Sequence, residues 1–153
     1  MAKILEPFDT INGKLGIAYA KIDGNNEEMF YAKDIKATVD KTKADVSVLG
    51  DVWTGSKTMG LKGTGTMTIY YVTSKFAELI KRYSDSAVDT YFEMVITNND
   101  PSSAAGMQEV VIHNVNLNSA VIAQLDAAAN DPLDESIDFT FTGFDILTPF
   151  KEL

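Results

Sequence analysis

The chain has 153 residues, 45% of them hydrophobic, which is enough for the core of one ordinary domain. It has no cysteine, which excludes disulfides, thiolate metal sites and cysteine nucleophiles. The net charge is −9 and Arg82 is the only arginine, so tight binding of nucleic-acid phosphates is not expected. No apolar run approaches the roughly 18 to 20 residues of a membrane helix. Glu6 and Pro7 come before any apolar signal region, so we expect cytoplasmic synthesis and no stable membrane association.

Charge is distributed unevenly along the chain. Residues 1–82 carry 12 basic and 10 acidic side chains, a net charge of +2. Residues 83–153 carry one basic and 12 acidic side chains, a net charge of −11. This asymmetry fits two solvated surfaces, and it also fits a subunit whose two ends complement each other in a head-to-tail stack. The sequence leaves both interpretations open.

The chain begins with an irregular segment and a first strand. Residues 1–12 contain Pro7 and show no clear period, so we expect an N-terminal arm. Larger apolar residues alternate with small ones between Gly13 and Gly24, which predicts a strand. The pair Asp23-Gly24 then supplies a turn signal.

Two further stretches with period two come next. Residues 34–40 and 44–48 each predict a half-buried strand, and residues 41–43 predict a turn between them. Residues 50–65 hold five of the ten glycines in a polar stretch, which favours a loop between strands. Residues 40–65 are therefore interpreted as a hairpin or loop.

One helix is predicted, over about residues 74–84, after a strand over residues 64–72. Its apolar residues recur at i, i+3, i+4 and i+7 in a single stripe, formed by Phe76, Leu79, Ile80 and Tyr83. A helix of about ten residues is not stable alone, so it must pack on a sheet.

The acidic half of the chain predicts more strands. Residues 91–97, 109–117 and 137–142 alternate with period two. A slip in the alternation at Gly143 suggests a β-bulge. Residues 119–130 fit a helix or a strand, and we favour extended structure there. About seven strands and one helix predict a mainly β protein, an antiparallel sandwich or barrel with one α-helix packed on it.

The candidate chemistry is sparse. His113 is the only histidine and lies in a predicted strand, so a structural role is favoured over a catalytic one. With one histidine and no cysteine, zinc and most transition-metal sites are not expected. The segment Gly55–Lys62 lacks the Gly-Lys-Ser/Thr ending of a phosphate-binding loop. The acidic residues Asp131, Asp134, Glu135 and Asp138 lack EF-hand spacing, which favours a solvated turn over a calcium site.

Several short segments are distributed almost from end to end of the chain. They are Gly13-Lys14-Leu15-Gly16, Val48-Leu49-Gly50-Asp51, Gly55-Ser56-Lys57, Lys62–Thr68, Asp100–Ser103, Leu133-Asp134-Glu135, Phe139-Thr140-Phe141 and Phe144–Leu147. In their order, spacing and total length, the chain resembles the tail-tube protein of contractile-tailed bacteriophages and of phage-like particles from Gram-positive prophages.

The resemblance implies a β-sandwich or half-barrel of which six copies form a ring with a continuous inner β-barrel. Rings would stack head to tail into a tube inside a sheath, in the tail of a virion or phage-like particle. Baseplate and tail-terminator proteins would be further partners. The tube would conduct DNA without binding it specifically, or would breach a membrane.

The assembly contacts are expected on the N-terminal arm and the 40–65 hairpin, because both are irregular or rich in glycine. The candidate interface residues are Asp45, Val48, Leu49, Asp51, Trp53, Ser56, Lys57 and Met59. We expect no catalytic residue, cofactor or metal, and no enzymatic activity. Two alternatives remain: a monomeric β-sandwich that binds carbohydrate or another ligand on a concave aromatic site, and a small β-barrel enzyme that uses carboxylates.

Overall fold

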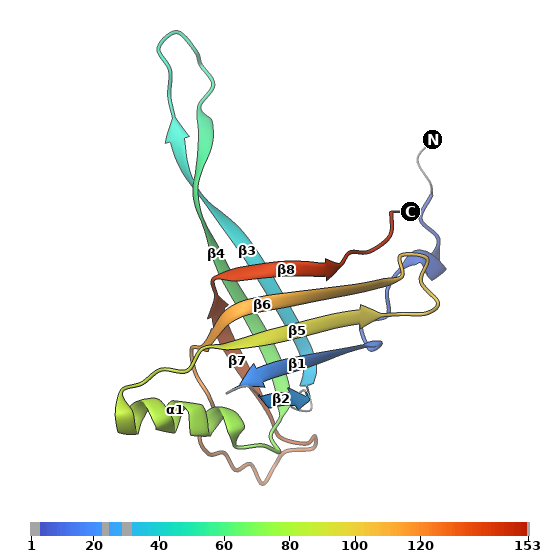
Figure 1. Ribbon diagram of the computed structural model, residues 1–153, viewed down its shortest axis with the longest axis vertical. Helices are drawn as coiled ribbons and strands as arrows, with labels where there is room; N and C mark the ends of the chain where they lie inside the picture. The colour runs from blue at the N-terminus through green and yellow to red at the C-terminus, as the bar shows by residue number, and fades with distance from the viewer. Residues whose placement is uncertain (1–3, 23–24, 29–31, 153) are drawn as a thin grey trace.

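The protein is built from two antiparallel layers of strands whose directions cross (Figure 1). The computed structural model describes residues 4–22, 25–28 and 32–152. Within these residues the first layer, sheet A, has a defined spatial order. It runs β2 (Asn25–Glu28), β1 (Gly16–Ile22), β5 (Phe92–Asn99), β6 (Met107–Leu117) and β8 (Gly143–Thr148).

The second layer, sheet B, consists of the long hairpin and the strand that follows it in space. Its order is β3 (Ala32–Val46), β4 (Gly55–Tyr70), β7 (Asp134–Phe141) and the last residues of β6. One α-helix, α1 (Lys75–Ser86), and a short 3-10 helix, η1 (Pro7–Asp9), complete the described elements. The prediction of a mainly β protein with one packed helix is confirmed.

Strand β6 belongs to both sheets, and this joins the layers. Its first part, through His113, pairs with β8, whereas Asn116 and Leu117 pair with β7. Asn114 lies between them with a φ of 55°, a left-handed conformation that lets the strand turn. Gly143 is the corner between β7 and β8, so the bulge predicted there is wrong. The slip in alternation marks the passage of the chain from one sheet to the other.

The core lies between the two sheets, because alternate residues of each strand point inward. The largest fully buried side chains come from β1, β4, β5, β6, β7 and α1. They are Phe76, Phe139, Ile22, Met67, Ile69, Met94, Ile137 and Val115. Phe76 and Leu79 form the inward face of α1, as the apolar stripe predicts, whereas Tyr83 of that stripe is exposed. The helix therefore closes one end of the sandwich (Figure 1).

Two predictions for the long hairpin are wrong. The turn predicted at residues 41–43 is absent, since β3 runs through it with only a register shift after Thr42. The glycine-rich stretch is also strand from Gly55 onward. Gly63 and Gly65 have a packing role: a Cβ on Gly63 would lie 2.6 Å from the ring of Phe141, so these glycines give room to aromatic side chains.

The connection between β6 and β7 is irregular. Residues 119–130 form neither a helix nor a strand, so the extended strand that we favoured there is not present. The turn predicted at Asp23-Gly24 lies outside the described residues, as do residues 1–3 of the predicted N-terminal arm. In the described part of the chain, no helix is both long and apolar enough to cross a membrane.

Candidate assembly surfaces

A two-stranded ribbon projects from the sandwich (Figure 1). Strand β4 pairs with β7 only from Gly63 onward, so residues 55–62 have β3 as their one strand partner among the described residues. We define the arm as residues 40–62, from the register pair Asp40 and Lys62 to the tip. Every residue of the arm is exposed to solvent. A ribbon without a packed face is only marginally stable by itself, so the arm is suited to contact another surface.

The tip of the arm presents large apolar side chains to water. Val48, Leu49, Val52 and Trp53 are exposed, and Leu49 is fully so. Local hydrogen bonds shape this turn: the backbone N–H of Asp51 donates to the carbonyl of Val48 (3.2 Å), and that of Trp53 donates to Oδ1 of Asp51 (3.0 Å). Exposed apolar clusters of this kind are typical of surfaces that contact another protein.

The structure places all eight predicted interface residues on the arm, but divides them between its parts. Half belong to the tip: Val48, Leu49, Asp51 and Trp53. The others lie on the paired stem: Asp45, Ser56, Lys57 and Met59. Asp45 and Ser56 are register partners, whereas Met59 is skipped in the register where the ribbon shifts. Val52 was missed from the sequence alone. Its apolar neighbours, in a segment without periodicity, could have pointed to it.

The N-terminal segment forms a second apolar surface. Asn12 donates its backbone N–H to Oδ2 of Asp100 (2.9 Å), and Ser103 Oγ donates to the carbonyl of Asp9 (3.0 Å). The segment is therefore fixed to the β5–β6 loop. Its large apolar side chains still point to solvent: Ile4, Leu5 and Phe8.

The C-terminal residues meet the same loop, since Lys151 N donates to the carbonyl of Ala105 (2.8 Å). Figure 1 shows the first and the last described residues at this end of sheet A, away from α1. The N-terminal apolar surface thus lies beside the β5–β6 loop, and it is separate from the arm.

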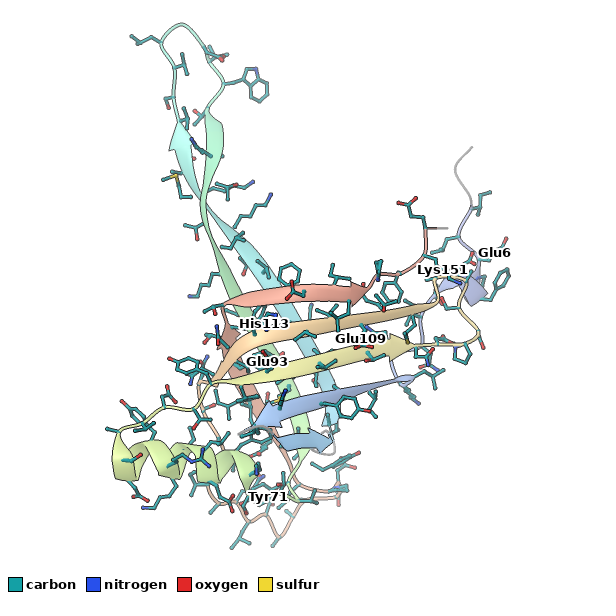
Figure 2. All side chains as sticks on the ribbon, in the orientation of Figure 1. Glu6, Tyr71, Glu93, Glu109, His113 and Lys151 are labelled. Carbon is teal, nitrogen blue, oxygen red and sulfur yellow. The ribbon has the colours of Figure 1, made fainter. Side chains whose placement is uncertain are left out.

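The outward face of sheet A carries His113 between two carboxylates. Its Nε2 lies 2.7 Å from Oδ2 of Asp145 on β8, and its Nδ1 lies 3.2 Å from Oε1 of Glu93 on β5. Figure 2 shows His113 and Glu93 close together on the sheet. The hydrogen bond to Asp145 and then the one to Glu93 raise the pKa of His113, because both favour the imidazolium. Neither partner is a hydroxyl group that the imidazole could activate, so the geometry agrees with a structural histidine.

The predicted acidic cluster does not converge on one point. Asp134 and Asp138 point outward from β7, and Glu135 points into the core, where it accepts a hydrogen bond from Val121 N (3.1 Å). Burial raises the pKa of Glu135. Asp134 instead forms an exposed ion pair with Lys33 (2.9 Å). Among the described residues, no three acidic or histidine side chains are placed to hold a metal ion.

The comparisons with known proteins agree on one family. The family model described as phage tail tube protein matches residues 3–148. This chain belongs to the phage tail tube family. One relative is the phage-like element PBSX protein XkdM of Bacillus subtilis (strain 168). It is 42% identical to this chain over 142 residues, which cover 93% of each chain.

Solved tail structures share the tail-tube fold. One is a chain of the PVC sheath–tube complex, an extracellular contractile injection system in its extended state. It has a TM-score of 0.68 at 11% identity, over 90% of each chain. Another is a chain of the six-fold symmetrised baseplate of the anti-feeding prophage, with a TM-score of 0.64 at 11% identity, over 87% of this chain and 92% of the other. At this identity, the similarity is one of fold. Family and neighbours alike are structural proteins of tails.

Proposed function

We propose that the protein is the repeating subunit of the inner tube of a contractile phage tail or phage-like bacteriocin. In this proposal six copies form a ring, and rings stack head to tail. The tube conducts DNA without specific binding, or breaches a membrane, and the protein is not an enzyme. The observation that carries the proposal is the solvent-exposed arm with its apolar tip, on a chain of the tail-tube family.

Hydrophobic burial favours a partner for the tip. Full burial of a Val or Leu side chain is worth about 1.5 to 3 kcal/mol relative to exposure. The tip offers three such side chains and the indole of Trp53 to water in the single subunit. A cluster of this size is stabilised when another surface covers it.

Charge favours a second copy as that partner. The arm carries four lysines and three aspartates, a net charge of +1, whereas the rest of the chain carries −10. The arm of one copy is therefore attracted to the acidic body of another. Because arm and body are different surfaces, the contact is head to tail, which produces closed rings or open filaments.

The names of the similar structures support the finer points. The anti-feeding prophage baseplate is six-fold symmetrised, and the PVC structure is a complex of sheath with tube. By extension we propose a six-membered ring here, with sheath, baseplate and terminator proteins as partners. The subunit would be made in the host cytoplasm and would function in the particle tail. A net charge of −9 disfavours adhesion of DNA to the tube.

The alternative of a carbohydrate-binding module has less support from the geometry. Sugar-binding modules need an aromatic platform in a concave surface. Trp53 is instead exposed at the tip of the arm, on a ribbon that has no packed face.

The proposal is tested by shortening the arm. Lys43 and Thr58 are register partners, so replacing residues 44–57 by Asn-Gly closes the ribbon with a two-residue turn. We expect the shortened protein to keep its circular dichroism spectrum and to remain a monomer by size-exclusion chromatography. The intact protein should form rings or tubes in negative-stain electron microscopy. Normal tubes from the shortened protein, or a strictly monomeric intact protein at every concentration and salt, would overturn the proposal.

A further inference from the structure

The outward face of sheet B is a continuous surface of small polar side chains. One row crosses all four strands in register: Thr38 of β3, Thr64 of β4, Thr140 of β7 and Asn116 of β6. The residues that alternate with these on each strand point into the core, as Met67 and Ile137 do. The row is therefore fixed by the same register that builds the core.

Two further rows repeat this chemistry. Thr66 pairs with Asp138, and Thr68 pairs with Ser136. Ser136, Asp138 and Thr66 are exposed, and Thr68 is half-buried. Hydroxyl and carboxylate groups of this size hydrogen-bond to water and offer no apolar surface for a partner to cover. Over residues 64–68 and 136–140, this face thus has the character of a permanently wet surface.

The charges on this face are few and slightly acidic. Asp34, Asp134 and Asp138 are opposed by Lys33 and Lys36. The ammonium group of Lys33 lies 2.9 Å from Oδ2 of Asp134, so one of the two lysines is already neutralised by a carboxylate. A polyanion therefore finds almost no unpaired positive charge here, and binding through released counterions is weak.

The outward face of sheet A differs in kind. A row of register partners across β1, β5 and β6 is formed by Tyr19, Val95 and Val111. Ile17 adds an exposed aliphatic side chain to the same face, beside the cluster of His113, Glu93 and Asp145 described above. An apolar row beside charged side chains is the mixture found where proteins contact one another, and it differs from the hydroxyl-rich face of sheet B.

A free edge allows sheet B to extend from copy to copy. Among the described residues β3 pairs only with β4, so its outer edge, 15 residues long, has unpaired backbone groups. An edge of this length is a template for a strand of another chain. Sheet B can therefore continue through a ring, with its polar rows aligned on one side.

We propose, on the basis of the tube proposed above, that the outward face of sheet B is the wall of the lumen. The face of sheet A is then directed toward protein partners. The hydroxyl-rich, nearly neutral wall holds a layer of water over which a polyanionic chain slides without being retained. The lining residues are Thr64, Thr66, Thr68, Ser136, Asp138 and Thr140.

Single cysteines test the assignment, because the chain contains none. Ser136→Cys places a thiol on the proposed wall, and Ser84→Cys places one on α1; both serines are exposed, which makes the pair matched. Each variant is assembled, and the tubes are treated with a small maleimide or with a maleimide that carries a long polyethylene glycol chain. The dissociated subunits of each variant serve as the reference for full labelling.

We expect Ser136→Cys in tubes to react with the small reagent and to lose its labelling by the large one, which cannot enter the lumen. Ser84→Cys should react with both. Labelling of Ser136→Cys by both reagents, or by neither, would overturn the assignment, as would protection of Ser84→Cys from the large reagent alone. Absence of rings and tubes from every variant and from the unmodified protein would instead contradict the tube itself.

Discussion

Phe139 occupies the space in which a side chain on Gly65, its register partner, would have to lie. A Cβ atom on Gly65 would be 2.5 Å from Cε2 of Phe139 and 2.9 Å from the carbonyl oxygen of Lys36. Phe139 is fully buried, so the ring cannot swing away into solvent. The core and the polar face of sheet B thus depend on the absence of one side chain in β4.

Gly65→Ala should therefore destabilise the subunit. Forcing one extra carbon into a packed core typically costs about 1 to 3 kcal/mol, and this position has a backbone carbonyl on its other side. The free energy of unfolding, from urea denaturation of the unassembled subunit, measures the change. Gly60→Ala is the control, because a Cβ on Gly60, in the same strand, has no neighbour within 4 Å. Equal stability of the two variants would contradict the packing role.

The same glycines show where sequence reasoning was limited. The period-two strands and the stripe of α1 were predictable, because alternation and helical spacing record which side of an element is buried. A glycine gives less information about its surroundings, since it is found both in loops and in strands beneath an aromatic ring. Gly65 was read as part of a loop, because its contact with Phe139 lies far along the chain.

The candidate surfaces were also predictable only in part. The tip of the arm was found from its irregular sequence, yet Val52 was missed because an exposed loop has no period. Residues 41–43 were misread as a turn. Both faces of this ribbon are in water, so its strands need no alternation of apolar and polar residues. The difference between the two sheet faces follows from register between distant strands, as at Thr64 and Thr140, which one sequence does not reveal.

The pKa of His113 predicts a pH dependence of stability. Its folded-state pKa is raised above the ordinary value of 6.5, by Asp145 first and then by Glu93. The contribution is therefore fully present below pH 6.5 and is lost as the pH rises through the raised folded-state pKa. We expect stability to fall over this window by up to about 1 kcal/mol, as for a partly exposed ion pair.

His113→Gln should remove this part of the pH dependence, and Asp145→Asn should remove more of it than Glu93→Gln. Urea denaturation of the subunit from about pH 5.5 to about pH 8.5 covers the range in which histidine titrates. An unchanged slope in His113→Gln would show that another group is responsible.

Glu135 predicts a gain in stability on neutralisation. Its carboxyl group is buried in the core, so burial raises its pKa above the ordinary 4.5, and ionisation at neutral pH costs folding free energy. That cost is absent below the ordinary pKa of 4.5, grows as the pH rises toward the raised pKa, and is complete above it. Glu135→Gln keeps an oxygen that can accept the hydrogen bond from Val121 N.

We expect Glu135→Gln to be more stable than the unmodified subunit by about 0.5 to 1 kcal/mol at pH 7, in the range of single stabilising changes. The difference should vanish below about pH 4.5, where the folded and unfolded forms are both protonated. Asp138→Asn, on the outward face of the same strand, should change stability by less than about 0.5 kcal/mol. A loss of stability in Glu135→Gln at pH 7 would contradict the cause given for the raised pKa.

The arm tip predicts a change in assembly without a change in folding. Val48→Ser removes an apolar side chain that is 62% exposed at the tip, and Val88→Ser removes one that is 61% exposed after α1. If the assembly buries Val48, its burial is worth about 1.4 kcal/mol, so Val48→Ser should raise the concentration needed for assembly about tenfold. Val88→Ser should not, and both should unfold like the unmodified subunit. Sedimentation across a concentration series is the measurement, and coincident curves for the three proteins would exclude a role for the tip.

The polar wall of sheet B predicts what added positive charge would do. Thr66→Lys places one ammonium group per subunit on the proposed lumen wall, and Ser84→Lys places one on α1. Both tubes should bind a short fluorescent single-stranded oligonucleotide more strongly than unmodified tubes, and the binding should weaken with salt as counterion release requires.

Location distinguishes the two variants, because a nuclease is too large to follow the oligonucleotide into the lumen. DNA held by Thr66→Lys tubes should survive nuclease treatment, whereas DNA held by Ser84→Lys tubes should be digested. Digestion in both cases would place Thr66 on the outside of the tube. Digestion in both cases would therefore contradict the assignment of the hydroxyl groups at Thr64, Thr66 and Thr68 to the lumen wall.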